Sequence, residues 1–428
     1  MLIPVLCEKL AFQRAFEPDN ITPCIERPDY VCYLTVMGVS ISTSSFMLLV
    51  SALISLIQAL ILVPLSGFAD LGDHRRHLLL LFTIVGGCGL YYTVCLAILT
   101  SVSTCAVSSY ALSLIPAYAK EYDSLHKNQA ATEISSRGGA ISLLCSTVVT
   151  SVAYAIAGTI ADEALGIKIS LALGGAWWAF VGVTGWTLLA SQHSNILPTG
   201  TNVVLFSLKS VWDTFALGFK LSNLFLAQLA FFLISEGTNT SGLITILIAR
   251  NELNVEPREL TIISIATPLG CSVGIMTMLT LIKKFKLNIK YVMITMSLLT
   301  AAIISLNVIG YYTKSFGLKS KWEVIGAFIT SSIFYGPVLV SFRILLAEIS
   351  PKGRECQLFT FNTLLSTGTT WIGTISVIYI IRLSGETRIS GFLPLALVLL
   401  GVLVLSQMDL TIARTQAEFY ATVSSPPE

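Results

Sequence analysis

Residues 138–161 read GGAISLLCSTVVTSVAYAIAGTIA, an uncharged run of 24 residues between Arg137 and Asp162. The hydrocarbon core of a bilayer is about 30 Å thick and is crossed by roughly 20 apolar residues in an α-helix. Because hydrocarbon offers no water to backbone amides, such a run is expected to be helical. The pattern recurs along the chain, in charge-free runs at 30–69, 78–119, 260–282, 291–313, 324–342, 356–381 and 389–408. The sequence therefore predicts an all-α membrane protein with many spans.

The composition supports this class and excludes others. The 428 residues are 54% hydrophobic and 12% charged, whereas a soluble domain carries about 25% charged residues. A net charge of +2 gives no indication of nucleic-acid binding. We find no serine–histidine–aspartate constellation, phosphate-binding loop or His/Cys metal spacing, so we expect no enzyme activity, no cofactor and no metal site.

The charge-free runs divide into eleven predicted transmembrane helices. Lys and Arg residues favour one side of these spans, by 14 to 11, and this side is predicted to be cytosolic. The N-terminal segment then faces the lumen. An odd number of spans with a luminal start suggests a twelve-helix plan whose first helix is missing. The predicted spans are 43–65, 77–98, 101–118, 138–160, 169–190, 221–248, 260–282, 291–312, 324–346, 357–381 and 390–408.

The polar stretch 191–220 separates the spans into two groups, as in a helical bundle of the major-facilitator type. We therefore divide the chain into a luminal segment, an N-terminal helical half, a cytosolic central loop, a C-terminal helical half and a cytosolic tail. Their boundaries are 1–42, 43–190, 191–220, 221–409 and 410–428. Residues 30–42 are expected to be a loop that leads into the first span.

The strongest candidate for a functional site is Glu236, near the middle of span 221–248, within the sequence SEGTNTSG at 235–242. Acidic residues at bilayer depth are rare and usually functional. The glycines and hydroxyl residues around it predict an interrupted helix, which marks the substrate site in many transporters. Glu236 would carry a proton and would have to face an aqueous cleft. The alternative is a structural, hydrogen-bonded glutamate.

Other polar residues inside the spans are candidates for the same pathway. Asn239 and Thr240 follow Glu236 on its own span, while Gln58 and Asn362 lie on other spans. These four side chains are expected either to line a substrate and proton pathway or to join helices by hydrogen bonds.

Charged residues at the cytosolic ends of spans predict a gate. Asp70 is expected to pair with Arg75 or Arg76, because an acid near a helix C-terminus needs a cationic partner. Arg343 is expected to pair with Glu348 or to extend toward the interface. For Asp70, Arg75 and Arg76 the alternative is simple positive-inside topology. For Arg343 and Glu348 a structural latch is favoured, and a substrate contact is the alternative.

The luminal segment carries two sequence signals of an oxidising compartment. Asn20-Ile21-Thr22 is a sequon for N-glycosylation at Asn20. Cys24 and Cys32 are close enough in sequence to form a disulfide on an oxidising side, and free thiols are the alternative.

An ordered series of short motifs resembles the autophagy-related protein 22 family, vacuolar effluxers of the major facilitator superfamily. One difference is that Glu236 stands where an aspartate is expected. The chain also begins where the first helix of that family should end. The matching segments are TSSF at 43–46, QA at 58–59, GFAD at 67–70, RR at 75–76, ISSRG at 134–138, GGAWW at 174–178, FLISEG at 232–237, ISPKGRE at 349–355 and WIG at 371–373.

The resemblance implies a multi-pass protein of the vacuole membrane. It implies export of neutral, leucine-like amino acids, released by autophagic degradation, from the vacuole to the cytosol. From Glu236 we expect this transport to be coupled to protons. One alternative is a non-transporting scaffold or nutrient sensor that retains the fold. Another is a transporter for a different solute, such as a sugar or a metal complex. Amino acids, protons and the lipid bilayer are thus the expected partners.

Overall fold

The computed structural model describes the two halves of a helical bundle and part of the segments around them. The described residues are 33–36, 39–42, 74–88, 93–115, 118, 127–160, 163–188, 209, 212, 216, 221–253, 255, 257–351, 355–363, 365, 366 and 369–424, together with ten scattered positions within 53–69.

Long helices make up most of this described part. The first half contains α3 (His74–Cys88), α4 (Thr93–Ser113), α6 (Lys127–Thr159) and α7 (Glu163–Leu188). The second half contains α9 (Ser222–Asn251), α10 (Pro257–Phe285), α11 (Ile289–Tyr312), α12 (Lys321–Ile349), α13 (Glu355–Thr363), α14 (Thr370–Ser384), the 3₁₀ turn η3 (Thr387–Gly391) and α15 (Phe392–Gln407). A further helix, α16 (Leu410–Ser424), follows within the predicted tail.

Seven of these helical segments are long and apolar enough to cross a membrane, and α14 is a shorter apolar helix. The predicted class of an all-α membrane protein is therefore confirmed. The number of eleven spans stays a prediction, because much of the chain before His74 lies outside the described residues. The seven segments are Ala130–Ile156, Lys168–Leu188, Ser222–Arg250, Ile262–Phe285, Ile289–Tyr312, Lys321–Ile349 and Thr387–Gln407.

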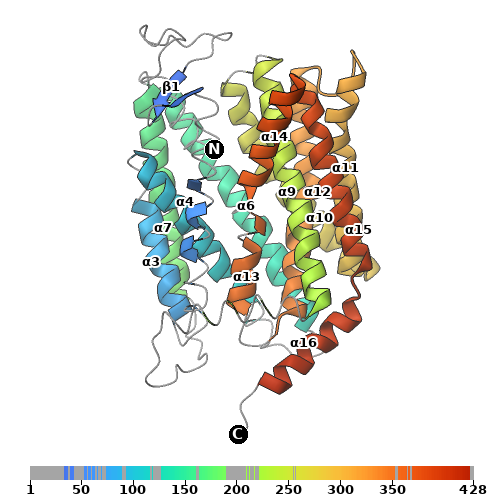
Figure 1. The fold of residues 1–428 in the computed structure, drawn as a ribbon. Helices are drawn as coiled ribbons and strands as arrows, with labels where there is room; N and C mark the ends of the chain where they lie inside the picture. Colours follow the sequence, from blue (N-terminus) through green and yellow to red (C-terminus); the bar gives the residue numbers. More distant parts are fainter. Residues whose placement is uncertain are drawn as a thin grey trace.

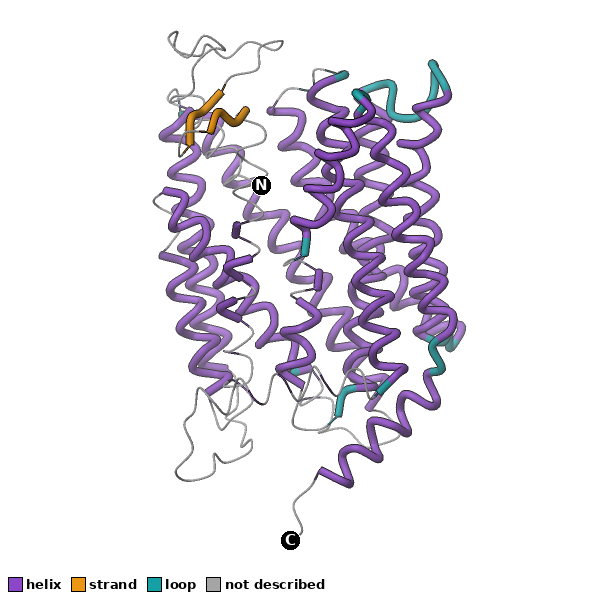
Figure 2. The backbone as a smooth tube through the Cα atoms, viewed as in Figure 1, coloured by secondary structure: helices purple, strands orange, loops and turns teal. Residues whose placement is uncertain are grey.

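The helices stand side by side in two groups, with α6 between them (Figures 1 and 2). Strand β1 lies at one end of the bundle and α16 at the other, and we call these the hairpin end and the α16 end. Helix α6 packs against α7 in its own half and against α10 and α12 in the other half. Helix α13 packs against α4. These two helices therefore carry contacts between the halves.

Close packing between α10 and α12 depends on glycines. A Cβ added at Gly274 would lie only 1.9 Å from the carbonyl oxygen of Ile333. A Cβ at Gly336 would lie 2.8 Å from the carbonyl oxygen of Cys271. Inside a bilayer, small residues let helix backbones approach and gain van der Waals contact. The second half is thus a tightly packed unit around its core of aliphatic and aromatic side chains.

Two sequence predictions about secondary structure were wrong. Residues expected to form a loop contain an antiparallel pair, β1 (Tyr33–Val36) and β2 (Val39–Ser42). Valine and isoleucine favour strands, and only Met37 and Gly38 separate the two. The predicted span 357–381 contains two α-helices, α13 and α14, with π-helical residues 365 and 366 between them, rather than one continuous α-helix. Serine, threonine and glycine at 366–369 are weak helix formers, and neighbouring side chains bond to the backbone there.

Candidate functional site

Glu236 lies midway along α9 and contacts the beginning of α14. Its side chain is buried, with the residue only 2% exposed. The backbone N–H of Gly373 donates to Oε1 at 2.8 Å, and the Thr369 hydroxyl lies 3.2 Å from Oε2. The first N–H groups of a helix have no partner within it and carry partial positive charge. Glu236 therefore caps the N-terminus of α14 inside the bundle.

This geometry differs from the expected one in two respects. The irregularity near Glu236 is in the facing segment, whereas α9 itself is continuous: residues 365 and 366, between α13 and α14, are π-helical, and we call this interruption the helix break. Two hydroxyls on α9 bond to their own helix, Thr238 to the carbonyl of Ile234 and Thr245 to that of Ser241, and they do not interrupt it. Gly237 serves close packing, because a Cβ there would lie 2.8 Å from the carbonyl oxygen of Pro394 on α15. In this conformation Glu236 is buried against α14.

Two of the predicted pathway residues lie with Glu236 against the same helix break. The Asn239 side-chain amide donates to the carbonyl oxygen of Ser366 at 2.9 Å. The Thr240 hydroxyl lies against Gly373, where an added Cβ would be only 2.0 Å from it. Together, the three α9 side chains bond to or contact both sides of the break.

The other two predicted pathway residues do not share those contacts. Asn362 lies on α13 and is 4% exposed, and its Oδ1 has no hydrogen-bond partner among the described residues. Gln58 is buried in the first half, where its Nε2 lies 2.6 Å from the Ser101 hydroxyl on α4. That bond joins helices within one half.

The predicted gate residues of the first half bind helix ends rather than a described acid. Arg75 donates to the carbonyl of Ser113 on α4 at 3.3 Å. Arg76 donates to the carbonyl of Trp186 on α7 at 3.3 Å, and its guanidinium lies 4.7 Å from the centre of the Trp186 ring. Their expected partner, Asp70, lies outside the described residues.

The pairing expected between Arg343 and Glu348 does not form. Glu348 instead pairs with Arg414 of α16, with 2.7 Å between Oε2 and Nη2. Residues five apart on a helix point about 140° away from each other, so these two side chains emerge on different faces of α12. The Glu348–Arg414 pair attaches α16 to the bundle. It leaves Arg343 free to face α6, where its Nη1 lies 4.0 Å from the Cβ position of Gly139.

One ion pair between the halves was missed by the sequence analysis. Lys283 near the end of α10 pairs with Glu133 of α6 at 2.5 Å, and Arg137 lies 3.4 Å from the same carboxylate. The spacing of Glu133 and Arg137 on one helix was visible in the sequence, but nothing there indicated Lys283. The pair joins the two halves near the α16 end.

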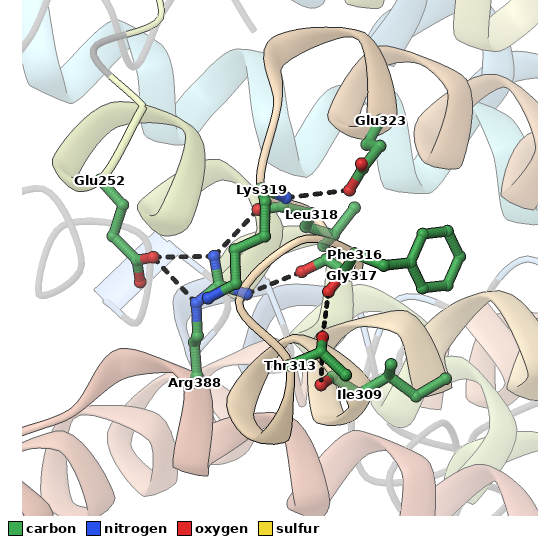
Figure 3. Close-up of polar contacts among 9 residues, drawn as sticks. All are labelled: Glu252, Ile309, Thr313, Phe316, Gly317, Leu318, Lys319, Glu323 and Arg388. Carbon is green, nitrogen blue, oxygen red and sulfur yellow. Dashed lines mark hydrogen bonds and ion pairs between the residues drawn. The ribbon is translucent and has the colours of Figure 1, made fainter.

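A second missed cluster is centred on Arg388, in the 3₁₀ turn before α15 (Figure 3). The Arg388 guanidinium is buried and bonds to Glu252 at 2.8 Å. It also donates to the carbonyls of Gly317 and Leu318, at 2.8 and 2.9 Å. Both loop residues have positive φ angles, +96° for Gly317 and +58° for Leu318. Arg388 thus holds the α11–α12 loop and the end of α9 together at the hairpin end.

Several remaining predictions are not tested by this geometry. Asn20, Cys24 and Cys32 all lie outside the described residues. Within the described part, no group of three or more His, Cys, Asp or Glu side chains is placed to hold a metal ion.

Sequence comparison relates the chain to one family over almost its whole length. The family model described as "Vacuole effluxer Atg22 like" matches residues 1–418. Autophagy-related protein 22-2 of Emericella nidulans is 24% identical, over 95% of this chain and 85% of that protein. Autophagy-related protein 22 of Vanderwaltozyma polyspora is 25% identical, over 97% of this chain and 88% of that protein.

Structural comparison identifies the fold. The human organic anion transporter MFSD10 aligns with a TM-score of 0.63 at 13% identity, covering 85% of this chain and 84% of its own. FucP, a major facilitator superfamily transporter in the outward conformation, aligns with a TM-score of 0.60 at 12% identity, covering 95% of this chain and 97% of its own. The chain therefore belongs to the vacuole effluxer Atg22 like family, and it is a multi-pass membrane transporter with the major facilitator fold, not an enzyme.

Proposed function

We propose that this transporter exports neutral, leucine-like amino acids from the vacuole lumen to the cytosol, together with protons, and that Glu236 carries the proton. The family description, vacuole effluxer, supports the direction and the compartment. The observation that carries the proton-coupling proposal is the buried Glu236 carboxyl group at the helix break.

The contacts of Glu236 suit a group that gains and loses a proton. The Thr369 hydroxyl lies 3.2 Å from Glu236 Oε2 and 2.7 Å from the carbonyl oxygen of Leu365. A hydroxyl has one hydrogen, so it cannot fully donate to both oxygens. A charged Glu236 accepts that hydrogen. A neutral Glu236 donates its own proton to Thr369, whose hydrogen then goes to Leu365.

The protonation state of Glu236 therefore sets the strength of the hydrogen bonds between α9 and the beginning of α14. A carboxylate forms charge-assisted bonds with the N–H of Gly373 and the hydroxyl of Thr369, and such bonds are roughly twice as strong as neutral ones. Protonation weakens the cap and removes the cost of a charge at bilayer depth. In the proposed cycle, the neutral form lets α14 move when the two halves rock past each other and expose the site to the other side.

Both gradients favour this direction. An acidic, degradative lumen is rich in protons and in free amino acids, so movement of both into the cytosol is downhill. The contacts that must open on the cytosolic side include the Glu133–Lys283 pair and the packing of α13 on α4.

Counterflow in proteoliposomes tests the proposal. Vesicles with the purified protein and an internal load of unlabelled leucine should accumulate external labelled leucine, and protein-free vesicles should not. A pH gradient should change the rate of net leucine flux. Absence of counterflow with leucine and with other neutral amino acids would refute the proposed function and would favour the scaffold or sensor alternative.

A further inference from the structure

Arg343 is a charged side chain inside the bundle that has no role in the proposed transport cycle. It lies on α12 where α6, α10 and α12 meet, because the Cβ position of Gly139 on α6 is 3.9 Å from Ile275 and 4.0 Å from Arg343 Nη1. Arg343 therefore lies at the junction of the two halves. It is six residues before the end of α12, about 9 Å from the α16 end at 1.5 Å per residue.

The Arg343 guanidinium forms no hydrogen bond or ion pair with any residue that the structure describes. Two described acids near this end of the bundle have other partners, since Glu348 of α12 pairs with Arg414 and Glu133 of α6 pairs with Lys283. Arginine inside a membrane is costly, and it usually pairs or faces a substrate pathway. Arg343 is only partly buried and none of its nitrogens is among the fully buried unpartnered atoms, so the guanidinium is accessible to an anion between the halves.

Two buried hydroxyls on α6 also lack partners. Ser135 and Ser136 are 4% and 0% exposed, and neither hydroxyl has a hydrogen-bond partner among the described residues. They precede Gly139 by four and three residues, so they lie on the same face of α6 as the glycine that contacts Arg343. Buried hydroxyls are nearly always hydrogen-bonded, so unsatisfied ones require an explanation. A guanidinium and two hydroxyls offer the donors that a carboxylate accepts.

The position of Arg343 relative to Glu236 fits one pathway. The Ser235 and Tyr335 hydroxyls are 3.2 Å apart, so Tyr335 of α12 lies at the depth of Glu236. Arg343 is eight residues further along α12, about 12 Å nearer the α16 end. Arg343 therefore lies on the same helix as the contact of Ser235 with Tyr335, on the side of that contact that faces the α16 end.

We infer that Arg343, with Ser135 and Ser136 across the junction of the halves, binds the carboxylate group of the substrate between the level of Glu236 and the α16 end. This inference rests on the proposed function, because it assumes a substrate that carries a carboxylate. Guanidinium binds carboxylate through two parallel N–H···O bonds, which selects for this group. The site would select substrates with a free carboxylate and would leave proton coupling to Glu236.

The test compares leucine with leucinol, which keeps the ammonium group and the side chain but lacks the carboxylate. Competition against labelled leucine in proteoliposomes gives the preference of each variant for leucine over leucinol. Arg343→Gln should raise the KM for leucine about tenfold to a hundredfold, as expected for a lost bond to a charged group, and should abolish the preference. Arg343→Lys should retain part of the preference for leucine over leucinol. The control Arg382→Gln, an exposed arginine on α14, should keep the wild-type preference.

The outcomes separate this inference from the proposed function. A wild-type protein without amino-acid counterflow refutes the proposed function. Wild-type counterflow combined with an unchanged preference in Arg343→Gln overturns only the Arg343 site. If Arg343→Gln does not fold, the Ser135→Ala/Ser136→Ala double variant decides: a reduced preference supports the site, and a wild-type preference overturns it. Arg343→Gln should still respond to a pH gradient, since the proton is assigned to Glu236.

Discussion

Replacing Gly373 with alanine adds one methyl group at the contact between α9 and α14. The new Cβ would lie 2.0 Å from the Thr240 hydroxyl and 2.6 Å from Glu236 Oε1. Both distances are far below van der Waals contact, so α14 or the two α9 side chains must move. The movement removes the Glu236 carboxyl group from the N–H of Gly373, which is now 2.8 Å away.

The expected cost has two parts. Loss of a hydrogen bond to a charged group costs about 1.5–3 kcal/mol. Overpacking of a filled site costs about 1–3 kcal/mol more. At about 2 °C per kcal/mol for a large domain, the thermal midpoint should fall by about 5 °C or more. Gel filtration of the detergent-purified protein after heating to a series of temperatures measures this midpoint.

The matched control is Gly242→Ala on α9, where an added Cβ would meet nothing within 4 Å. This variant should match or exceed the wild-type midpoint, because alanine favours the helix. In a Glu236→Ala background, Gly373→Ala should lower the thermal midpoint by less than it does in wild type, although the overlap with Thr240 remains. An unchanged midpoint in Gly373→Ala, or an equal cost in both backgrounds, would refute the contact between Glu236 and the beginning of α14.

Two further predictions concern the contacts at the ends of the bundle. Glu133→Gln should change the rate of leucine counterflow less than about fivefold, because a half-exposed ion pair contributes about 0.2–1 kcal/mol, and a larger change would contradict this modest role of the pair. Arg388→Gln should destabilise the protein by about 3–5 kcal/mol, because it leaves Glu252 and two loop carbonyls without their cation. Low yield of monodisperse protein is the expected readout, with Arg382→Gln as the control, and a wild-type yield would contradict the structural role of Arg388.

Hydropathy predicted the spans from residue 138 onward well, because a segment that crosses a bilayer must form its backbone hydrogen bonds within its own helix. The prediction was wrong for 357–381, where a charge-free segment contains two α-helices rather than one. Side chains of another helix satisfy the broken backbone there, as Glu236 does for Gly373 and Asn239 does for Ser366. Because these hydrogen bonds come from another helix, the sequence of 357–381 alone does not indicate where its α-helix is interrupted.

The candidate site was predicted in part. A single acid in a long apolar run identified Glu236, and its neighbours Asn239 and Thr240 followed from their position on the same helix. The partner of Lys283 could not be predicted, because residues far apart in sequence meet only in the folded bundle. The Arg343–Glu348 pairing was a mistake that helix geometry alone excludes, since a spacing of five does not place two side chains on one face.

The most direct test of proton coupling compares wild type with Glu236→Gln in leucine transport by proteoliposomes, with and without a pH gradient. Glutamine keeps the shape of the side chain and can still accept the N–H of Gly373, so folding should be preserved. The gradient should stimulate leucine flux in wild type and in the exposed-acid control Glu386→Gln, whereas Glu236→Gln should catalyse exchange at a rate that does not depend on the gradient. A Glu236→Gln protein that responds to the gradient as wild type does would contradict proton coupling through Glu236.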